Sequence, residues 1–323
     1  MPYRSTLTWE MGRKRSAILH DIRHFFYINK VVEVETPVLS QGTVTDQHLD
    51  SFMCNYDYFN DSTRQTVLYL QTSPEFAMKR LLSSGFGDIY QITKAFRHEE
   101  AGRFHNPEFT ILEWYRLNYD HFQLMDEVGG LLQLILNCNK PIKITYQTLF
   151  LKFTNIDPLV ASREELLNFL KEQNKLSDWL VNEEDIDVLL QVILSEIIEP
   201  QIGKEQPCFI YNFPCSQASL AQLSKKDHRV AERFECYYKG IELVNGFNEL
   251  IDVNNQLARF KQDNINRRKN GLVEKPIDYN FISALEAGLP QCSGVALGVD
   301  RLIMLACNKE TIDEVLTFPI SRA

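Results

Sequence analysis

Two acidic residues, Glu242 and Glu249, stand at equal distances on either side of the dipeptide Asn245-Gly246. Asn-Gly between two strand-like runs is a strong hairpin signal, because both central residues of a type I′ turn need a positive φ. In such a hairpin Glu242 would face Glu249, with Cβ atoms roughly 4.5–5.5 Å apart, where like charges destabilise the sheet. The pattern therefore indicates a cation between the acids, either Mg²⁺ or a substrate ammonium. Alternatively, the acids splay into water or are neutralised by neighbouring Arg and Lys side chains.

A second group of polar residues separates two strand-like runs, 88–98 and 109–117. Arg97 stands at the end of the first run, and the loop that follows is polar. Period-two alternation places four residues on one face of the second run: Phe109, Ile111, Glu113 and Tyr115. Such a unit could clamp a phosphate, read a base edge and stack a nucleobase. An ordinary hairpin with a charged tip explains the same residues, and two histidines without a third ligand do not make a metal site.

Near the carboxyl end, small residues up to Gly298 precede a helical pattern that contains Arg301. Glycine permits close approach of the backbone to a ligand, and an arginine at a helix start can reach a phosphate. A glycine that only makes a turn explains the same pattern. This segment is therefore a candidate phosphate contact.

These residues need elements that position them. Ser73-Pro74-Glu75 combines a cap residue, a proline suited to the first helical turn and an acid, and so predicts a helix start. The segment from about 121 to 200 reads as a helical insertion with charged runs. The other predicted elements are a helix around 18–26, a strand at 31–36, a helix at 74–84, strands at 88–98, 109–117, 208–212 and 236–251, and helices at 254–270 and 299–307. Together they predict one α+β domain with an antiparallel sheet.

The chain has 323 residues, with 34 Lys and Arg against 43 Asp and Glu, so its formal net charge is −9. A net-acidic chain does not produce the overall positive electrostatic potential that attracts a nucleic-acid backbone, so non-specific nucleic-acid binding is not expected. No apolar run approaches the roughly 18–20 residues of a bilayer-spanning helix, and no signal-peptide core is present. Seven cysteines without a Cys-x-x-Cys pair argue against a disulfide framework and favour a reducing cytoplasm.

Three of these segments, in this order, resemble the three signature motifs of class II aminoacyl-tRNA synthetases, and their detail is similar to the lysyl branch. The first motif is the helix and strand of 15–37, the second runs from Phe96 to Phe109, and the third is 298–301. The stretch 233–250 is similar to the metal-and-substrate hairpin of the lysyl enzymes. The resemblance implies an α+β catalytic domain over residues 1–323, with an antiparallel sheet flanked by helices. It also implies a homodimer whose interface the first motif forms.

Two departures from the lysyl enzymes point to a different acceptor. Lysyl-tRNA synthetases carry an anticodon-binding barrel before the first motif, whereas here that motif begins close to Met1. The chain also has Ser73 where Ala is usual and Ala296 where Gly is usual. These features resemble free-standing paralogues that activate (R)-β-lysine with ATP and transfer it to a lysine of elongation factor P, so tRNA is not expected as a partner. The alternative is a truncated lysyl-type enzyme acting on tRNA or a small-molecule amine.

The resemblance also implies roles for individual residues. Arg97 would hold the α-phosphate and Arg301 the γ-phosphate, as the catalytic residues, while Phe109 would stack on adenine. The further contacts to ATP would come from His98, Glu99, Asn106, Glu242, Leu243 and Gly298. Mg²⁺ would bind Glu242 and Glu249. The diamino substrate would lie among Ser73, Pro74, Glu75, Glu113, Tyr115, Glu249 and Ala296. His98 and Phe104 stand where the lysyl enzymes usually have Asn and Arg, which puts those two contacts in question.

Overall fold

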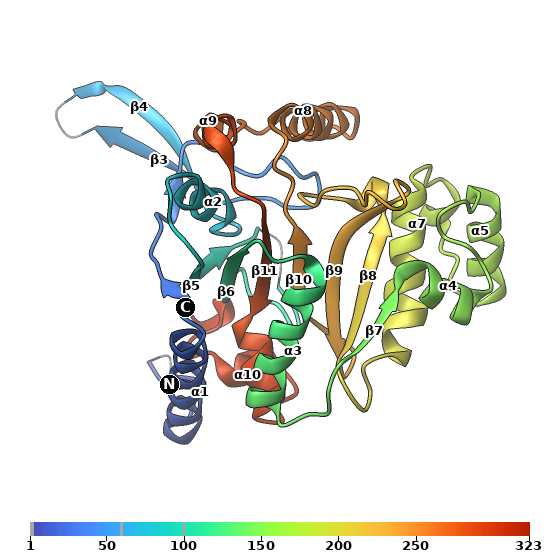
Figure 1. Ribbon diagram of the computed structural model, residues 1–323, viewed down its shortest axis with the longest axis horizontal. Coiled ribbons are helices and arrows are strands. Elements are labelled where there is room, and N and C mark those ends of the chain that lie inside the picture. The colour runs from blue at the N-terminus through green and yellow to red at the C-terminus, as the bar shows by residue number, and fades with distance from the viewer. Residues whose placement is uncertain (1–2, 59–60, 99–100) are drawn as a thin grey trace. The chain divides into compact units, whose positions relative to one another are not determined.

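The computed structural model describes residues 3–58, 61–98 and 101–323. This part of the chain divides into two compact units (Figure 1). Unit 1 is discontinuous and comprises Met1–Asn118 together with Leu250–Ala323, and unit 2 is Tyr119–Glu249. The prediction of a single domain over 1–323 stays a prediction.

Unit 1 holds two groups of strands. The first has the order β1-β5-β6-β11, and the second has the order β2-β4-β3. Their bounds are β1 Val32–Glu33, β2 Leu39–Ser40, β3 Met53–Tyr58, β4 Asp61–Leu70, β5 Ile89–Phe96, β6 Glu108–Leu117 and β11 Cys292–Gly298. The pairing of β5 with β6 confirms the predicted strand–loop–strand unit, and it is antiparallel, as is that of β6 with β11. The pairing of β1 with β5 is parallel, so the sheet is mixed and not purely antiparallel.

Five helices accompany these strands in unit 1, followed by two short 3-10 turns. Their bounds are α1 Trp9–Ile28, α2 Glu75–Ser83, α8 Val253–Lys269, α9 Tyr279–Gly288, α10 Val299–Ala306, η4 Ile312–Val315 and η5 Ile320–Arg322. Phe26 of α1 is fully buried and stacks on Tyr90 of β5, with ring centroids 4.3 Å apart. Helices α2 and α9 lie side by side (Figure 1), where Phe76 stacks on Phe281 at 4.6 Å. The α+β class, with helices flanking a sheet, is thereby confirmed.

A buried ion pair joins the helix of the first motif to the segments of the other two. Arg15 of α1 lies 2.6 Å from the carboxylate of Asp300 in α10, which is 2% exposed. The same carboxylate accepts a hydrogen bond from the Thr110 amide of β6 at 2.7 Å. Arg15 also donates to the Thr110 hydroxyl at 3.0 Å. Three elements that are distant in sequence therefore meet at one polar cluster, in which the buried carboxylate is paired with a cation.

Unit 2 contains four strands in the order β10-β9-β8-β7, with a helical region before β8. The strand bounds are β7 Ile142–Thr145, β8 Cys208–Pro214, β9 Val230–Tyr238 and β10 Ile241–Asn248. The helical segments are α3 His121–Leu136, α4 Tyr146–Thr154, α5 Arg163–Glu172, α6 Asp178–Val181, α7 Ile186–Ile193, η1 Leu194–Ile198, η2 Glu199–Gln201 and η3 Cys215–Gln217. Buried residues of α4, α5 and α7 form one core with Cys208, Ile210 and Tyr237 of β8 and β9. The predicted helical stretch 121–200 thus contains one short strand, β7.

The predicted turn at Asn245-Gly246 is wrong. Strand β10 runs through both residues and pairs with β9, and neither residue has a positive φ. The hairpin turn lies earlier, at Lys239 and Gly240, whose φ values of 52° and 74° are those of a type I′ turn. Gly246 serves packing instead, because a Cβ atom there would lie 2.7 Å from a ring carbon of Phe234 on the opposed strand.

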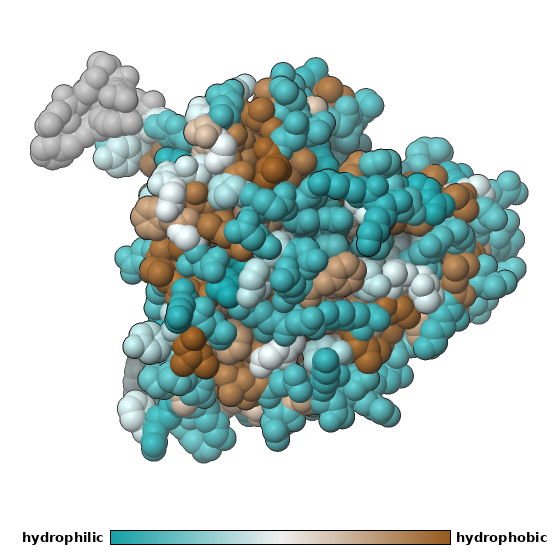
Figure 2. All heavy atoms as spheres, viewed as in Figure 1, coloured by the Kyte–Doolittle hydropathy of each residue, from teal (hydrophilic) through white to brown (hydrophobic). Residues whose placement is uncertain are grey.

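Apolar residues are interspersed with hydrophilic ones on the face that Figure 2 shows. Several large apolar side chains of α1 are exposed, among them Trp9 at 83%, Tyr27 at 79% and Ile28 at 60%. In the described residues, none of the helices has both the length and the apolar character needed to cross a membrane.

Candidate functional site

Ser73 links two of the predicted substrate residues at the start of α2. Its hydroxyl donates to Oε1 of Glu113 at 2.6 Å and accepts from the Glu75 amide at 3.1 Å. Pro74 occupies the residue before the helix, with φ −75°. Glu113 is 2% exposed, so this hydrogen bond stabilises a buried carboxylate. The structure therefore brings together Ser73, Glu75 and Glu113, three of the residues that the resemblance assigns to the substrate.

Strand β11 places small residues beside this carboxylate. Ala296 lies directly opposite Glu113 on β6, and its neighbours on the same face, Gly294 and Gly298, lie opposite Tyr115 and Ile111. Directly opposed side chains point to the same face of a sheet. The predicted face of β6 is thus flanked by residues with little or no side chain, which leaves room for a ligand above it.

Arg97 and Phe109 form the next part of the site. The guanidinium carbon of Arg97 lies 5.1 Å from the centroid of the Phe109 ring, and its Nε donates to the Thr72 carbonyl at 3.4 Å. A guanidinium over an aromatic face is a favourable cation–π arrangement. Both predicted nucleotide contacts therefore lie on the face that carries Glu113, because Phe109 and Glu113 are separated by an even number of positions on β6.

Arg301 stands in the first turn of α10, just after Gly298. Its Nε donates to the Phe104 carbonyl at 3.2 Å, and Nη2 lies within hydrogen-bond distance of His105 Nε2. A Cβ at Gly298 would be 3.6 Å from Cδ of Arg301. The second and third motifs therefore meet at this arginine.

Asn106 and His98, two of the predicted nucleotide contacts, interact with other residues of the chain. The amide of Asn106 donates to the Glu108 carbonyl at 2.6 Å, and its oxygen accepts from the Ile320 amide at 2.9 Å. His98 is exposed, and its ring meets that of Phe52 edge-on at 5.1 Å. Glu99 lies outside the described residues.

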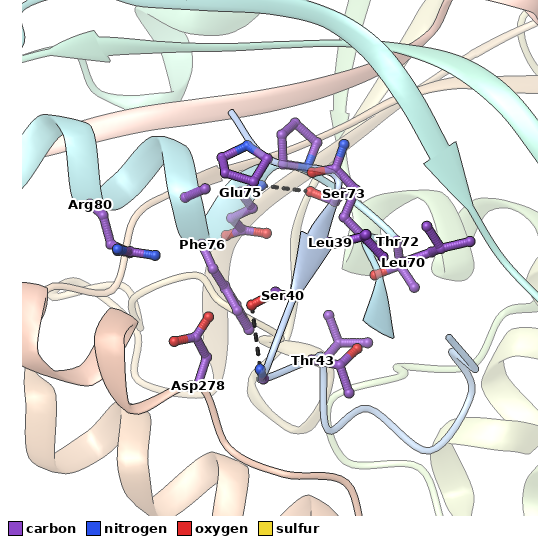
Figure 3. Close-up of a pocket in the computed structure, with 16 residues that line it drawn as sticks. Leu39, Ser40, Thr43, Leu70, Thr72, Ser73, Glu75, Phe76, Arg80 and Asp278 are labelled. Atoms are coloured by element: carbon purple, nitrogen blue, oxygen red, sulfur yellow. Dashed lines mark hydrogen bonds between the residues drawn. The ribbon is translucent and has the colours of Figure 1, made fainter. Parts of the chain in front are cut away.

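A pocket of about 90 Å³ opens beside the start of α2 (Figure 3). Its lining residues come from the end of β2 and the loop after it, from the turn before α2 and the first residue of that helix, and from the residue that caps α9: Ser40, Thr43, Thr72, Ser73, Glu75 and Asp278. The Glu75 carboxylate points into this space in Figure 3. The predicted substrate acid is thus accessible from the pocket.

Glu242 of β10 and Glu249, which directly follows that strand, lie on the same side of the chain for a reason that the sequence does not reveal. Glu242 is opposite Tyr237, whereas Val244 is opposite Cys236, so Leu243 is an extra residue in a β-bulge. This insertion shifts the alternation by one and places Glu249, like Phe247, on the face of Glu242. Glu242 and Glu249, which the sequence predicted to face each other across a hairpin, therefore follow each other along one extended stretch of chain. The bulge also leaves Leu243 without a directly opposed residue on β9.

A third acid, Glu235, lies on the same face and was missed by the sequence reasoning. It accepts from Arg233 at 2.5 Å and from the Tyr237 hydroxyl at 2.6 Å. Burial alone would lower the pKa of Arg233, but the carboxylates of Glu235 and Glu242 raise it above its usual value. The sequence feature that could have identified Glu235 is the alternation Arg233-Phe234-Glu235, which puts the cation and the acid on one side of a strand.

Carboxylate oxygens are suitable ligands for Mg²⁺, which is usually held by one or two carboxylates together with substrate phosphates. Glu242 shares its face with Glu235 and Glu249, so the donor chemistry of unit 2 fits this ion. Among the residues that the structure describes, no group of three or more His, Cys, Asp or Glu side chains is arranged to hold a metal by itself. The site fits a metal that depends on the nucleotide for its remaining ligands.

Comparisons with known proteins agree with this geometry. A family model described as tRNA synthetases class II (D, K and N) matches residues 3–322. The relatives include proteins named elongation factor P–(R)-β-lysine ligase from Yersinia pestis (strain Pestoides F) and Yersinia pseudotuberculosis serotype O:1b. Each is 55% identical over 310 residues, which cover 96% of this chain and 95% of the relative. The chain therefore belongs to the class II tRNA synthetase family of the D, K and N type.

Proposed function

We propose that this chain is an ATP-dependent ligase that activates (R)-β-lysine as its adenylate and transfers the β-lysyl group to a lysine side chain of elongation factor P. The observation that carries the proposal is the 55% identity, over 96% of the chain, to relatives named for this reaction. The surroundings of Glu113, where Ser73 donates a hydrogen bond and Ala296 lies directly opposite, support it.

In the first step the substrate carboxylate attacks the α-phosphate of ATP, and pyrophosphate leaves. A carboxylate is already ionised at neutral pH, so the protein contributes positioning and charge stabilisation. Arg97 is the residue for the α-phosphate and Arg301 the residue for the γ-phosphate. Phe109 offers a ring for stacking on adenine, and the nucleotide contacts further include His98, Glu99, Asn106, Leu243 and Gly298.

Magnesium fits the acids of unit 2, with Glu242 and Glu249 as its proposed ligands and Glu235 as a neighbour on the same face. When bound, the ion would neutralise part of the charge on the polyphosphate.

The amino-acid substrate carries two ammonium groups, which need acids and hydrogen-bond acceptors around them. Glu75, Glu113 and Tyr115 supply these groups in unit 1, and Glu249 supplies another in unit 2. Glu113 and Glu249 are 2% and 1% exposed, so their charges are only weakly screened by solvent.

In the second step the acceptor lysine attacks the carbonyl of the adenylate, and AMP leaves. The acceptor amine must lose a proton to act as a nucleophile. The product is an amide between the β-lysyl group and the side chain of the protein substrate.

The active form is proposed to be a cytoplasmic homodimer. Helix α1, which includes the helix of the first motif, has an exposed apolar surface suited to a second copy, formed by Trp9, Tyr27 and Ile28. Sedimentation at micromolar concentration should show twice the chain mass of 37.6 kDa, and a monomer alone would contradict the dimer.

The ligase function is tested by incubating the purified chain with ATP, (R)-β-lysine and elongation factor P. Mass spectrometry should show one added β-lysyl group on the protein acceptor. An ATP–pyrophosphate exchange panel over α-lysine, both β-lysine enantiomers and other amino acids identifies the activated substrate. Efficient charging of tRNA with no change in the mass of elongation factor P would overturn the assignment in favour of a lysyl-type synthetase.

A further inference from the structure

Lys79 of α2 is a completely buried lysine beside the proposed substrate site. Its side chain is 0% exposed, and its Nζ donates to Oε1 of Glu75 at 2.5 Å, one helical turn earlier. Lysine is almost never fully buried unless its charge is paired, because transferring an ammonium out of water is costly. The formation of a single helix does not require a buried ammonium group, so we expect Lys79 to have a further role.

The aromatic contacts between α2 and α9 fix the position of this ammonium. The Nζ atom lies 5.7 Å from the centroid of the Phe281 ring, and Phe281 stacks on Phe76 at 4.6 Å with an angle of 3° between the rings. Phe76 is the residue directly after Glu75. The ammonium thus lies against a ring that is itself held in place by stacking on Phe76.

The ion pair with Lys79 fixes the orientation of the Glu75 carboxylate. Oε1 is bound to Lys79, whereas Oε2 has no hydrogen-bond partner among the described residues. The Glu75 side chain is 15% exposed, and in Figure 3 it points into the pocket beside Ser73. One oxygen is therefore held by the protein and the other is available to a ligand.

The charge of Lys79 also matters to the second acid. Ser73 binds the Glu113 carboxylate and the Glu75 amide at the same time, so the two glutamates belong to one small region. Like charges that share a partly buried site repel each other, and a neighbouring cation reduces that repulsion. Lys79 places a positive charge beside this pair of acids, on the side of Glu75.

We propose that Lys79 is a positioning residue for substrate recognition, which holds Oε1 of Glu75 so that Oε2 is presented to an ammonium group of the diamino acid. This inference rests on the proposed function, and it assigns a role to a residue that does not itself touch the substrate. Lys79 then acts on the affinity for the amino acid and not on the affinity for ATP.

A double-mutant cycle tests this role. Four chains are compared in ATP–pyrophosphate exchange: the unaltered chain, Lys79→Met, Glu75→Gln and the double variant. Lys79→Met should raise the KM for (R)-β-lysine about tenfold or more and change the KM for ATP less than about twofold. In the Glu75→Gln background the same substitution should change the KM for (R)-β-lysine less than about twofold, because the group through which Lys79 acts has been neutralised.

Two controls separate positioning from a general effect on the fold. All assays are run below the lowest melting transition of the four chains, and if Lys79→Met does not fold, Lys79→Gln replaces it in the same cycle. Lys175→Met removes a surface ion pair with Glu196, 2.9 Å long, and should leave both KM values unchanged.

The outcomes distinguish the inference from the proposed function. An unchanged KM for (R)-β-lysine in Lys79→Met, or an equal increase in both backgrounds, would overturn the role of Lys79 while leaving the ligase assignment intact. Activation by the unaltered chain of an amino acid with a single amino group, and none with (R)-β-lysine, would overturn both.

Discussion

The surroundings of Glu113 give a prediction about the choice between β-lysine and α-lysine. Ser73→Ala removes the hydroxyl that donates to Glu113 at 2.6 Å, and Ala296→Gly removes the methyl group directly opposite the same residue on β11. A hydrogen bond to a charged group contributes about 1.5–3 kcal/mol. One added or missing carbon in a substrate pocket changes discrimination by about 1–3 kcal/mol, or roughly 10- to 200-fold.

Moving an amino group by one carbon changes which donors and acceptors it can reach. Both substitutions alter the surroundings of one carboxylate, so we expect their effects to be coupled and not additive. The double variant should shift the ratio of kcat/KM for (R)-β-lysine to that for α-lysine towards α-lysine by at least about tenfold. Ala296→Gly alone should shift it in the same direction.

The measurement is ATP–pyrophosphate exchange with each amino acid at saturating ATP. Ser83→Ala is the matched control, since it removes a serine hydroxyl at the end of the same helix, where that oxygen has no hydrogen-bond partner among the described residues. An unchanged ratio in the double variant would show that Ser73 and Ala296 do not set the preference, even if the chain is a β-lysine ligase.

Further predictions concern unit 2. Glu242→Gln should abolish pyrophosphate exchange while the protein still melts cooperatively, and near-normal exchange would exclude a role in magnesium binding. Gly246→Ala should destabilise the protein by about 1–3 kcal/mol, because the new Cβ would lie 2.7 Å from a ring carbon of Phe234, and adding Phe234→Leu should recover part of the loss in a thermal melt. Burial lowers the pKa of His121 against the opposing effect of Glu232, so the unfolded chain binds more protons and stability should fall as pH drops below about 6.5. His121→Phe should flatten this dependence in melts between pH 7 and pH 5, and an unchanged slope would contradict it.

Local patterns predicted the elements that carry several candidate residues of unit 1. The start of α2 followed from Ser73-Pro74-Glu75, and the shared face of Phe109 and Glu113 followed from alternation along β6, since both depend only on residues close in sequence. The hydrogen bond from Ser73 to Glu113 could not be predicted in this way, because it depends on how the turn before α2 approaches β6.

The hairpin error in unit 2 has a different cause. Asn245-Gly246 carries the local signal of a type I′ turn, but the packing of Phe234 against Gly246 favours an extended strand there. The turn forms at Lys239-Gly240, where Lys239 adopts a positive φ despite its side chain. The bulge at Leu243, which puts Glu242 and Glu249 on one face, depends on register with β9 and leaves no mark in the sequence.

The discontinuity of unit 1 has a consequence for biosynthesis. Arg15 finds its partner Asp300 only after 285 further residues have been synthesised, and strand β11 reaches its place beside β6 nearly as late. Unit 2 is continuous, so all of its strands are synthesised before the second segment of unit 1, Leu250–Ala323. Because domains generally fold as units during synthesis, we expect unit 2 to become compact first. Until β11 is synthesised, the nascent chain presents an unpaired edge of β6, to which another extended segment could pair.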